Sequence, residues 1–140
     1  MKYLWLLLTL GLTVGIFYIS SQPMAVNGQV SRGLADMLVG FCNAAGFSLG
    51  ANPEYTIRKL AHFLEFLLLA YLWCKTYSSF YVSANMSSGY ILFLCLFTAV
   101  LDEFIQLHSQ GRSSQITDVL LDFSAAFCAW LMYRIYYWSK

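Results

Sequence analysis

The chain has 140 residues, of which 59% are hydrophobic, 18% aromatic and 11% charged. Soluble domains usually carry about 25% charged residues, so this composition indicates a protein embedded in a membrane. The net charge of +1 offers no basic surface, and we therefore exclude nucleic acid as a partner. The length allows one compact domain, and we expect a single all-α membrane domain over residues 1–140.

Four apolar stretches predict membrane-spanning helices. They cover residues 3–19, 57–77, 89–107 and 117–138, with a polar loop expected at 77–88. Each stretch comes close to the roughly 20 residues that a helix needs to cross the hydrocarbon core. The sequence therefore predicts a four-transmembrane-helix bundle whose first helix is an uncleaved signal anchor.

Proline residues and an amphipathic segment divide the first two spans. Pro23 predicts the end of the first helix, whereas Asn52-Pro53-Glu54 is typical of a helix start. Between residues 31 and 45, apolar side chains recur at helical spacing and leave charged residues on the other side. This pattern predicts an interfacial amphipathic helix between spans one and two that lies flat on the membrane.

Alternating spans bring most of the polar residues to one end of the bundle. His62 and Glu65 share one face of the second helix, and Asp102 and Gln106 share one face of the third. Ionisable groups inside membrane spans are costly and by default indicate function. The predicted ligand-binding site collects Ser21, Gln22, Arg58, Lys59, His62, Glu65, Asp102, Glu103, Gln106, Arg112, Asp118 and Asp122.

The two ends of the bundle carry equal numbers of Lys and Arg residues, so the positive-inside rule alone does not orient the chain. Lys2 flanks the first span without an acidic neighbour, whereas Arg58, Lys59 and Arg112 stand beside carboxylates. We therefore expect a multi-pass protein with both termini in the cytoplasm and the polar end on the outer face.

The polar motifs of this chain resemble those of the VanZ-like family. The resemblance implies a small bacterial integral membrane protein of the plasma membrane that acts in the cell envelope. It also implies an association with resistance to teicoplanin, a lipid-tailed glycopeptide. One departure is Asp122, where the family usually has asparagine. The motifs are Ser20-Ser21-Gln22, Arg58-Lys59-x-x-His62-Phe63-x-Glu65-Phe66, Asp102-Glu103-x-x-Gln106, Arg112 and Asp118.

Several functions of the polar end remain open. Arg58 and Arg112 offer the fork geometry that suits phosphate or carboxylate, which favours binding of a membrane lipid or a lipid-linked envelope precursor. Alternatively, the protein is an intramembrane hydrolase or transferase acting on such a precursor. In that case His62 and Glu65 are the candidate catalytic residues, with either as general base.

Two further interpretations of the same residues need no lipid. Ion pairs and hydrogen bonds among them would fix the helix positions and serve the fold alone. A hard divalent cation would absorb the surplus negative charge, although no metal ligands are assigned. Its oxygen ligands would come from Glu65, Asp102, Glu103 and Asp118.

Overall fold

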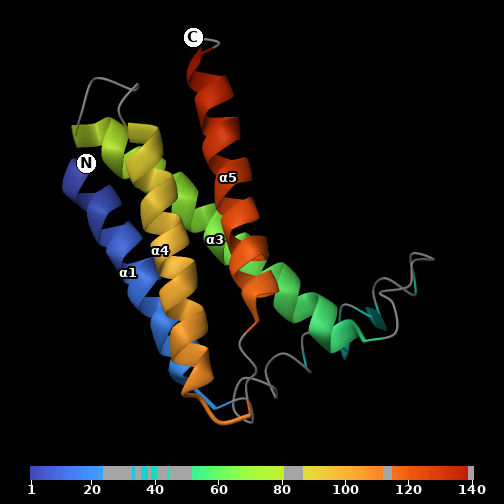
Figure 1. Cartoon of the computed structure of the whole chain (residues 1–140). Helices are drawn as coiled ribbons and strands as arrows, with labels where there is room; N and C mark the ends of the chain where they lie inside the picture. Colours follow the sequence, from blue (N-terminus) through green and yellow to red (C-terminus); the bar gives the residue numbers. More distant parts are fainter. Residues whose placement is uncertain are drawn as a thin grey trace.

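Four long helices make up most of what the computed structural model describes, namely residues 1–23, 52–80, 87–111 and 115–138 and six isolated positions between 33 and 44. The helices are α1 (Lys2–Ser21), α3 (Pro53–Phe80), α4 (Ser87–Leu107) and α5 (Ile116–Trp138). They run alternately, so both chain termini lie at the upper end in Figure 1. The predicted all-α class is confirmed in these regions. The predicted interfacial helix at 31–45 lies largely outside the described residues and stays a prediction.

The predicted helix ends near proline agree with the structure. α1 ends at Ser21, and Gln22 is extended ahead of Pro23 because the residue before proline disfavours the helical conformation. α3 begins at Pro53, and the backbone N–H of Thr56 donates to the carbonyl oxygen just before that proline at 3.2 Å. Proline is well suited to the first helical position because it has no N–H that needs a partner.

The predicted loop at 77–88 is too long. α3 continues to Phe80, and α4 begins before the predicted loop would end. The hydroxyls of Ser78 and Ser79 donate to the carbonyl oxygen of Lys75 at 3.2 and 2.7 Å. Serine is a poor helix former in general, but these bonds fold its hydroxyl back onto the helix. Ser78 and Ser79 therefore belong to the end of α3.

Three helices in the described part of the chain are long and apolar enough to cross a membrane. They are Lys2–Ser21, Gly89–Leu107 and Ile116–Tyr137. α3 contains the second predicted span, residues 57–77. This helix is 28 residues long but more polar, and it is not among these three. Large apolar side chains cover the outside of the bundle, as Leu7, Phe93 and Ile135 illustrate with 60–67% exposure. Such a surface is typical of contact with lipid.

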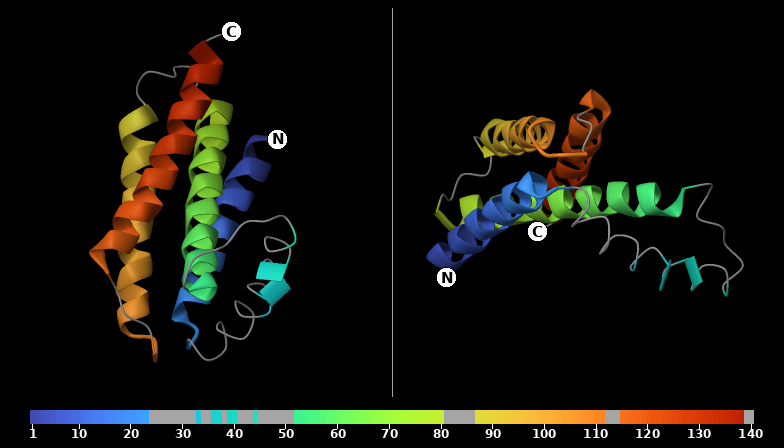
Figure 2. Two further views of the ribbon diagram at one scale, coloured as in Figure 1. Left: turned by 90° about the vertical axis from the view of Figure 1, so that its right-hand side faces the viewer. Right: turned by 90° about the horizontal axis from the view of Figure 1, so that it is seen from below.

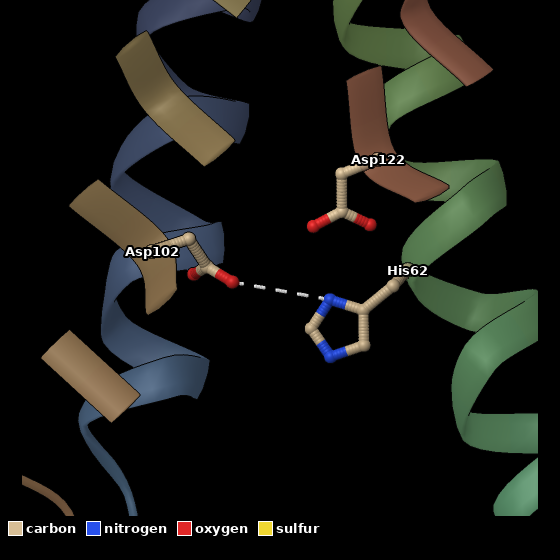
Figure 3. Close-up of side chains that lie close together, drawn as sticks. All are labelled: His62, Asp102 and Asp122. Atoms are coloured by element: carbon tan, nitrogen blue, oxygen red, sulfur yellow. Dashed lines mark ion pairs between the residues drawn. The ribbon is translucent and has the colours of Figure 1, made fainter. Parts of the chain in front are cut away.

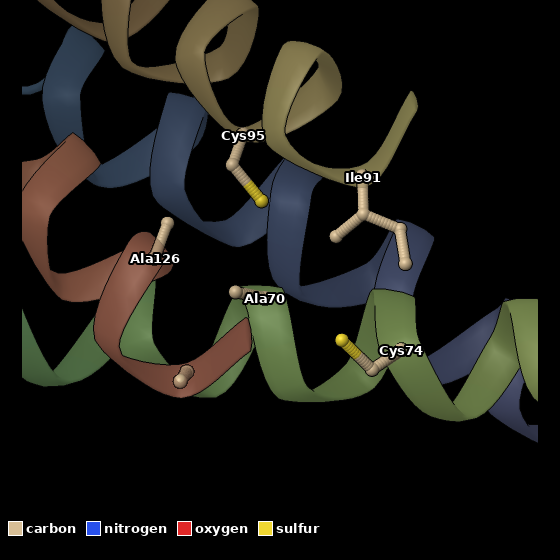
Figure 4. Close-up of a cluster of buried hydrophobic side chains, with 6 residues drawn as sticks. Ala70, Cys74, Ile91, Cys95 and Ala126 are labelled. Carbon is tan, nitrogen blue, oxygen red and sulfur yellow. The ribbon is translucent and has the colours of Figure 1, made fainter. Parts of the chain in front are cut away.

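α3 holds the bundle together, since it contacts α1, α4 and α5 (Figure 2). Small buried side chains line its contacts with α4 and α5, among them Ala70, Cys74, Cys95 and Ala126 (Figure 4). Each of these side chains is at most 2% exposed. Small residues allow membrane helices to approach closely, and the resulting van der Waals packing stabilises the bundle.

At the end of the bundle that holds the termini, a lysine side chain lies close to aromatic rings. The Nζ atom of Lys75 lies 5.9 Å from the ring centroid of Trp5 and 5.8 Å from that of Tyr133. Nearby, the hydroxyls of Thr9 and Thr76 form a buried hydrogen bond of 2.9 Å between α1 and α3. Aromatic residues and lysines that reach outward are typical of a membrane–water interface.

Candidate functional site

Polar side chains of α3, α4 and α5 meet at the opposite end of the bundle, where α4 ends and α5 begins (Figure 1). Several of them are almost completely buried, which is unusual for groups that carry or attract charge. Their burial requires partners, because a polar group removed from water without a hydrogen bond costs free energy. The buried members are Asp102, Glu103, Gln106 and Asp122, with exposures of 0%, 4%, 6% and 1%.

His62 lies between two carboxylates from different helices. Its Nδ1 atom is 3.9 Å from Oε2 of Glu65, three residues later on α3, and 3.9 Å from Oδ2 of Asp102 on α4 (Figure 3). The side-chain amide of Gln106 donates to the same Asp102 oxygen at 2.8 Å and fixes its orientation. An imidazole placed in this way can act as a general base or as a metal ligand.

Asp122 completes the cluster from α5. Its carboxylate points toward His62 and Asp102 in Figure 3. Within the described residues, neither carboxylate oxygen of Asp122 has a hydrogen-bond partner. One donor atom from each of these three side chains lies within 4.8 Å of the others, so together they can hold a metal ion.

Two other predicted carboxylates connect helices. Asp118 forms an ion pair with Lys59, which links the starts of α5 and α3. Lys59 also lies over the ring of Tyr55, with its Nζ atom 5.1 Å from the ring centroid. Glu103 accepts a hydrogen bond of 3.0 Å from the backbone N–H of Gln115, immediately before α5. These contacts fix the start of α5 against its neighbours.

The predicted residues of α1 stand at its C-terminal end. The Ser21 hydroxyl donates to the carbonyl oxygen of Tyr18 in its own helix at 2.7 Å, and Gln22 is half-buried. The hydroxyl of Ser109 donates to the carbonyl oxygen of Ser20 at 2.8 Å. This bond ties the turn after α4 to the end of α1.

The structure describes only one of the two predicted arginines. Arg58 is half-buried on α3, one helical turn before His62. Arg112 falls in segment 112–114, which lies outside the described residues. Its place in the predicted site therefore stays a prediction.

Ser109 and Gln115 are not among the predicted site residues, although both make contacts at this end. Both lie outside the helices, where hydrophobic periodicity gives no signal. The position of Gln115, directly before an apolar run, was the one available signal. Backbone N–H groups at the start of a helix have no partner within the helix. A nearby carboxylate can therefore accept a hydrogen bond from one of them.

Comparison with known families identifies the chain. No curated protein matches it, and no solved structure matches it. The profile of the VanZ/LLP1 family matches residues 5–137, which include all of α3 and α4 and the entire polar end. Together with the apolar helices, this match shows that the chain is a membrane protein belonging to the VanZ/LLP1 family.

Proposed function

We propose that the polar end binds the headgroup of a lipid-linked or lipidated molecule at the outer leaflet of the bacterial plasma membrane. The observation that carries this proposal is the burial of Asp102, Glu103 and Asp122, each at most 4% exposed, in helices with lipid-facing surfaces. Buried ionisable groups in membrane helices are expensive and commonly mark ligand sites. At the other end the Lys75 side chain lies close to aromatic rings. Such an arrangement is more typical of a membrane–water interface than of a ligand-binding site.

In this proposal α3 is the fourth membrane span. It packs against the three apolar helices, and its 28 residues are long enough to cross. Its charged residues are Glu54, Arg58, Lys59 and Glu65 in the first half and Lys75 near the far end, which leaves residues 66–74 uncharged. The ion pair of Lys59 and the aromatic contacts of Lys75 reduce the cost of placing these charges in the bilayer.

The chemistry of the polar end suits an amphiphile with a mixed headgroup. Arg58 offers a guanidinium for a phosphate, whereas Gln106 and the carboxylates suit amides, amines and sugar hydroxyls. Lipid-linked envelope precursors combine such a headgroup with a long apolar chain, and so does teicoplanin. Binding either one supports a role in the cell envelope, with lower susceptibility to lipid-tailed glycopeptides as its consequence.

Native mass spectrometry of the detergent-solubilised chain tests this proposal. A polyprenyl phosphate and teicoplanin are offered separately, each in competition with phosphatidylglycerol. We expect the wild type to retain the polyprenyl phosphate preferentially. Arg58→Gln should weaken this binding about 10–100-fold, because a hydrogen bond to a charged group contributes about 1.5–3 kcal/mol. Lys75→Gln removes the same charge at the other end and should leave binding unchanged. Equal retention of all lipids would contradict the proposal.

A second candidate function, an intramembrane enzyme, is favoured by the position of His62. The Nδ1 atom of the imidazole has carboxylate oxygens of Glu65 and Asp102 at 3.9 Å, which suits a general base. Enzymatic action would change the mass of the bound lipid over time. Glu65→Gln should then stop this change while the lipid stays bound. If the mass change continues in Glu65→Gln, that side chain has no part in the reaction.

A further inference from the structure

Three side chains from three different helices converge in the polar cluster. They are His62 of α3, Asp102 of α4 and Asp122 of α5, and their donor atoms lie within 4.8 Å of one another (Figure 3). His62 Nδ1 and Asp102 Oδ2 lie 3.9 Å apart. We propose that these three residues bind a divalent transition-metal cation of the zinc class.

The surroundings of Asp122 point to a cation. The side chain is 1% exposed, and in the described parts of the chain both of its oxygens are without a hydrogen-bond partner. It also experiences the charges of four other carboxylates, those of Glu65, Asp102, Glu103 and Asp118. A buried, ionised carboxylate surrounded by negative charge is unfavourable unless it takes up a proton or a positive charge is added. A divalent cation bound by Asp122 supplies that charge.

The donor set selects the kind of metal. One imidazole nitrogen and two carboxylate oxygens suit Zn²⁺, whereas Ca²⁺ and Mg²⁺ prefer oxygen ligands alone. Ligand distances of about 2.0–2.2 Å place neighbouring donors of a tetrahedral zinc site about 3.3 Å apart. The 3.9 Å between His62 and Asp102 therefore needs only a small closure by side-chain rotation. The amide of Gln106 already orients Asp102, as outer hydrogen bonds do in metal sites.

Two other carboxylates at this end are engaged elsewhere. Asp118 pairs with Lys59, and Glu103 accepts the backbone N–H of Gln115 at 3.0 Å. Both contacts would have to break before these groups could bind a metal. The proposed ligand set thus differs from a site of carboxylates alone, and it depends on His62 and Asp122.

Three protein ligands leave at least one coordination position open, as catalytic zinc sites do. A phosphate oxygen of a bound headgroup is a suitable fourth ligand. This last step rests on the proposed function, whereas metal binding by the three side chains does not. The two proposals can therefore fail separately.

The test uses the full chain, purified in detergent through a tag without histidine, stripped with a chelator and titrated with Zn²⁺. Elemental analysis should find one zinc per chain. We expect Asp122→Asn and His62→Gln to weaken zinc binding by at least about 10-fold, since even outer-shell changes cost about 10–100-fold. The matched control is His108→Gln, which removes an exposed histidine outside the cluster and should bind zinc as the wild type does.

The possible outcomes separate the two proposals. Absence of stoichiometric zinc in the wild type overturns the metal site, and so does equal binding by Asp122→Asn and His62→Gln. If a variant does not fold, X-ray absorption of the zinc-loaded wild type decides, because the site requires a single imidazole and oxygen ligands without sulfur. Polyprenyl phosphate binding is then measured with the zinc-loaded chain and again with chelator present. If the lipid binds without zinc, the headgroup is not bridged by a metal, and the proposed function is unaffected. If zinc binds but the lipid does not, the proposed function is wrong, and the metal site is unaffected.

Discussion

Two aspartates one turn apart on α5 have opposite surroundings. Asp118 is partly exposed and forms an ion pair with Lys59, with both side chains 22% exposed. Asp122 is buried and, among the residues described, has no hydrogen-bond partner. A partly exposed ion pair contributes up to about 1 kcal/mol to stability. A buried carboxylate without such partners lowers stability, which proteins tolerate mainly at functional sites.

The two aspartates therefore predict opposite effects of the same substitution. With chelator present, Asp122→Asn should leave the midpoint of thermal unfolding in detergent unchanged or raise it, because the change removes a buried charge without changing the shape. Asp118→Asn should lower the free energy of unfolding by up to about 1 kcal/mol, because the ion pair is lost. If Asp122→Asn is the more destabilising of the two, Asp122 serves the fold and is not held there for a ligand.

At the level of the helices, close packing depends on small side chains. Ala70 of α3, Cys95 of α4 and Ala126 of α5 lie in one buried cluster, each 0% exposed. No larger side chain fits between the helices without moving them, because interiors are packed densely. The spacing of α3, α4 and α5 also sets the distances in the polar cluster, since the same helices carry its residues.

Enlarging one of these alanines should therefore destabilise the bundle. Ala126→Leu adds three carbon atoms to the buried cluster and should lower the free energy of unfolding by about 1–3 kcal/mol, the usual cost of overpacking. Thermal unfolding in detergent measures the effect. Ala61→Leu makes the same change on the exposed surface of α3 and should have little effect. Equal stability of the two variants would show that this contact is not tightly packed.

The helices themselves were predictable from the sequence because their signals are local. Apolar runs of suitable length and the two prolines predict α1 and α3 with ends close to the observed ones. The error at 77–88 also has a local cause. Whether Ser78 and Ser79 end a helix or form a loop depends on where their hydroxyls bond, and composition does not contain that information.

The polar end was predictable only in part. Helical periodicity predicts that Asp102 and Gln106 share an inward face, and both are buried. Which carboxylate meets Lys59 and which meets His62 depends on how α3, α4 and α5 are rotated against each other. That rotation follows from packing of the whole bundle, so sequence spacing within one helix does not determine the pairs.

For the whole molecule, the central claim is that the polar end faces the outside, where a lipid-linked molecule or an antibiotic can reach it. The two ends differ in character, with buried carboxylates at one and cations on aromatic rings at the other. Two exposed positions mark these ends, Gln110 after α4 and Ser79 near the end of α3. Gln110 is preferred to its neighbour Gly111, whose φ of 79° disfavours any side chain.

Cysteine labelling of intact bacterial cells tests this claim directly. The four natural cysteines are replaced by serine or alanine, and Gln110→Cys or Ser79→Cys is introduced singly. With a thiol reagent that does not cross membranes, we expect Gln110→Cys to react in intact cells and Ser79→Cys to react only after the cells are opened. The reverse pattern would place the polar end in the cytoplasm and contradict binding at the outer leaflet.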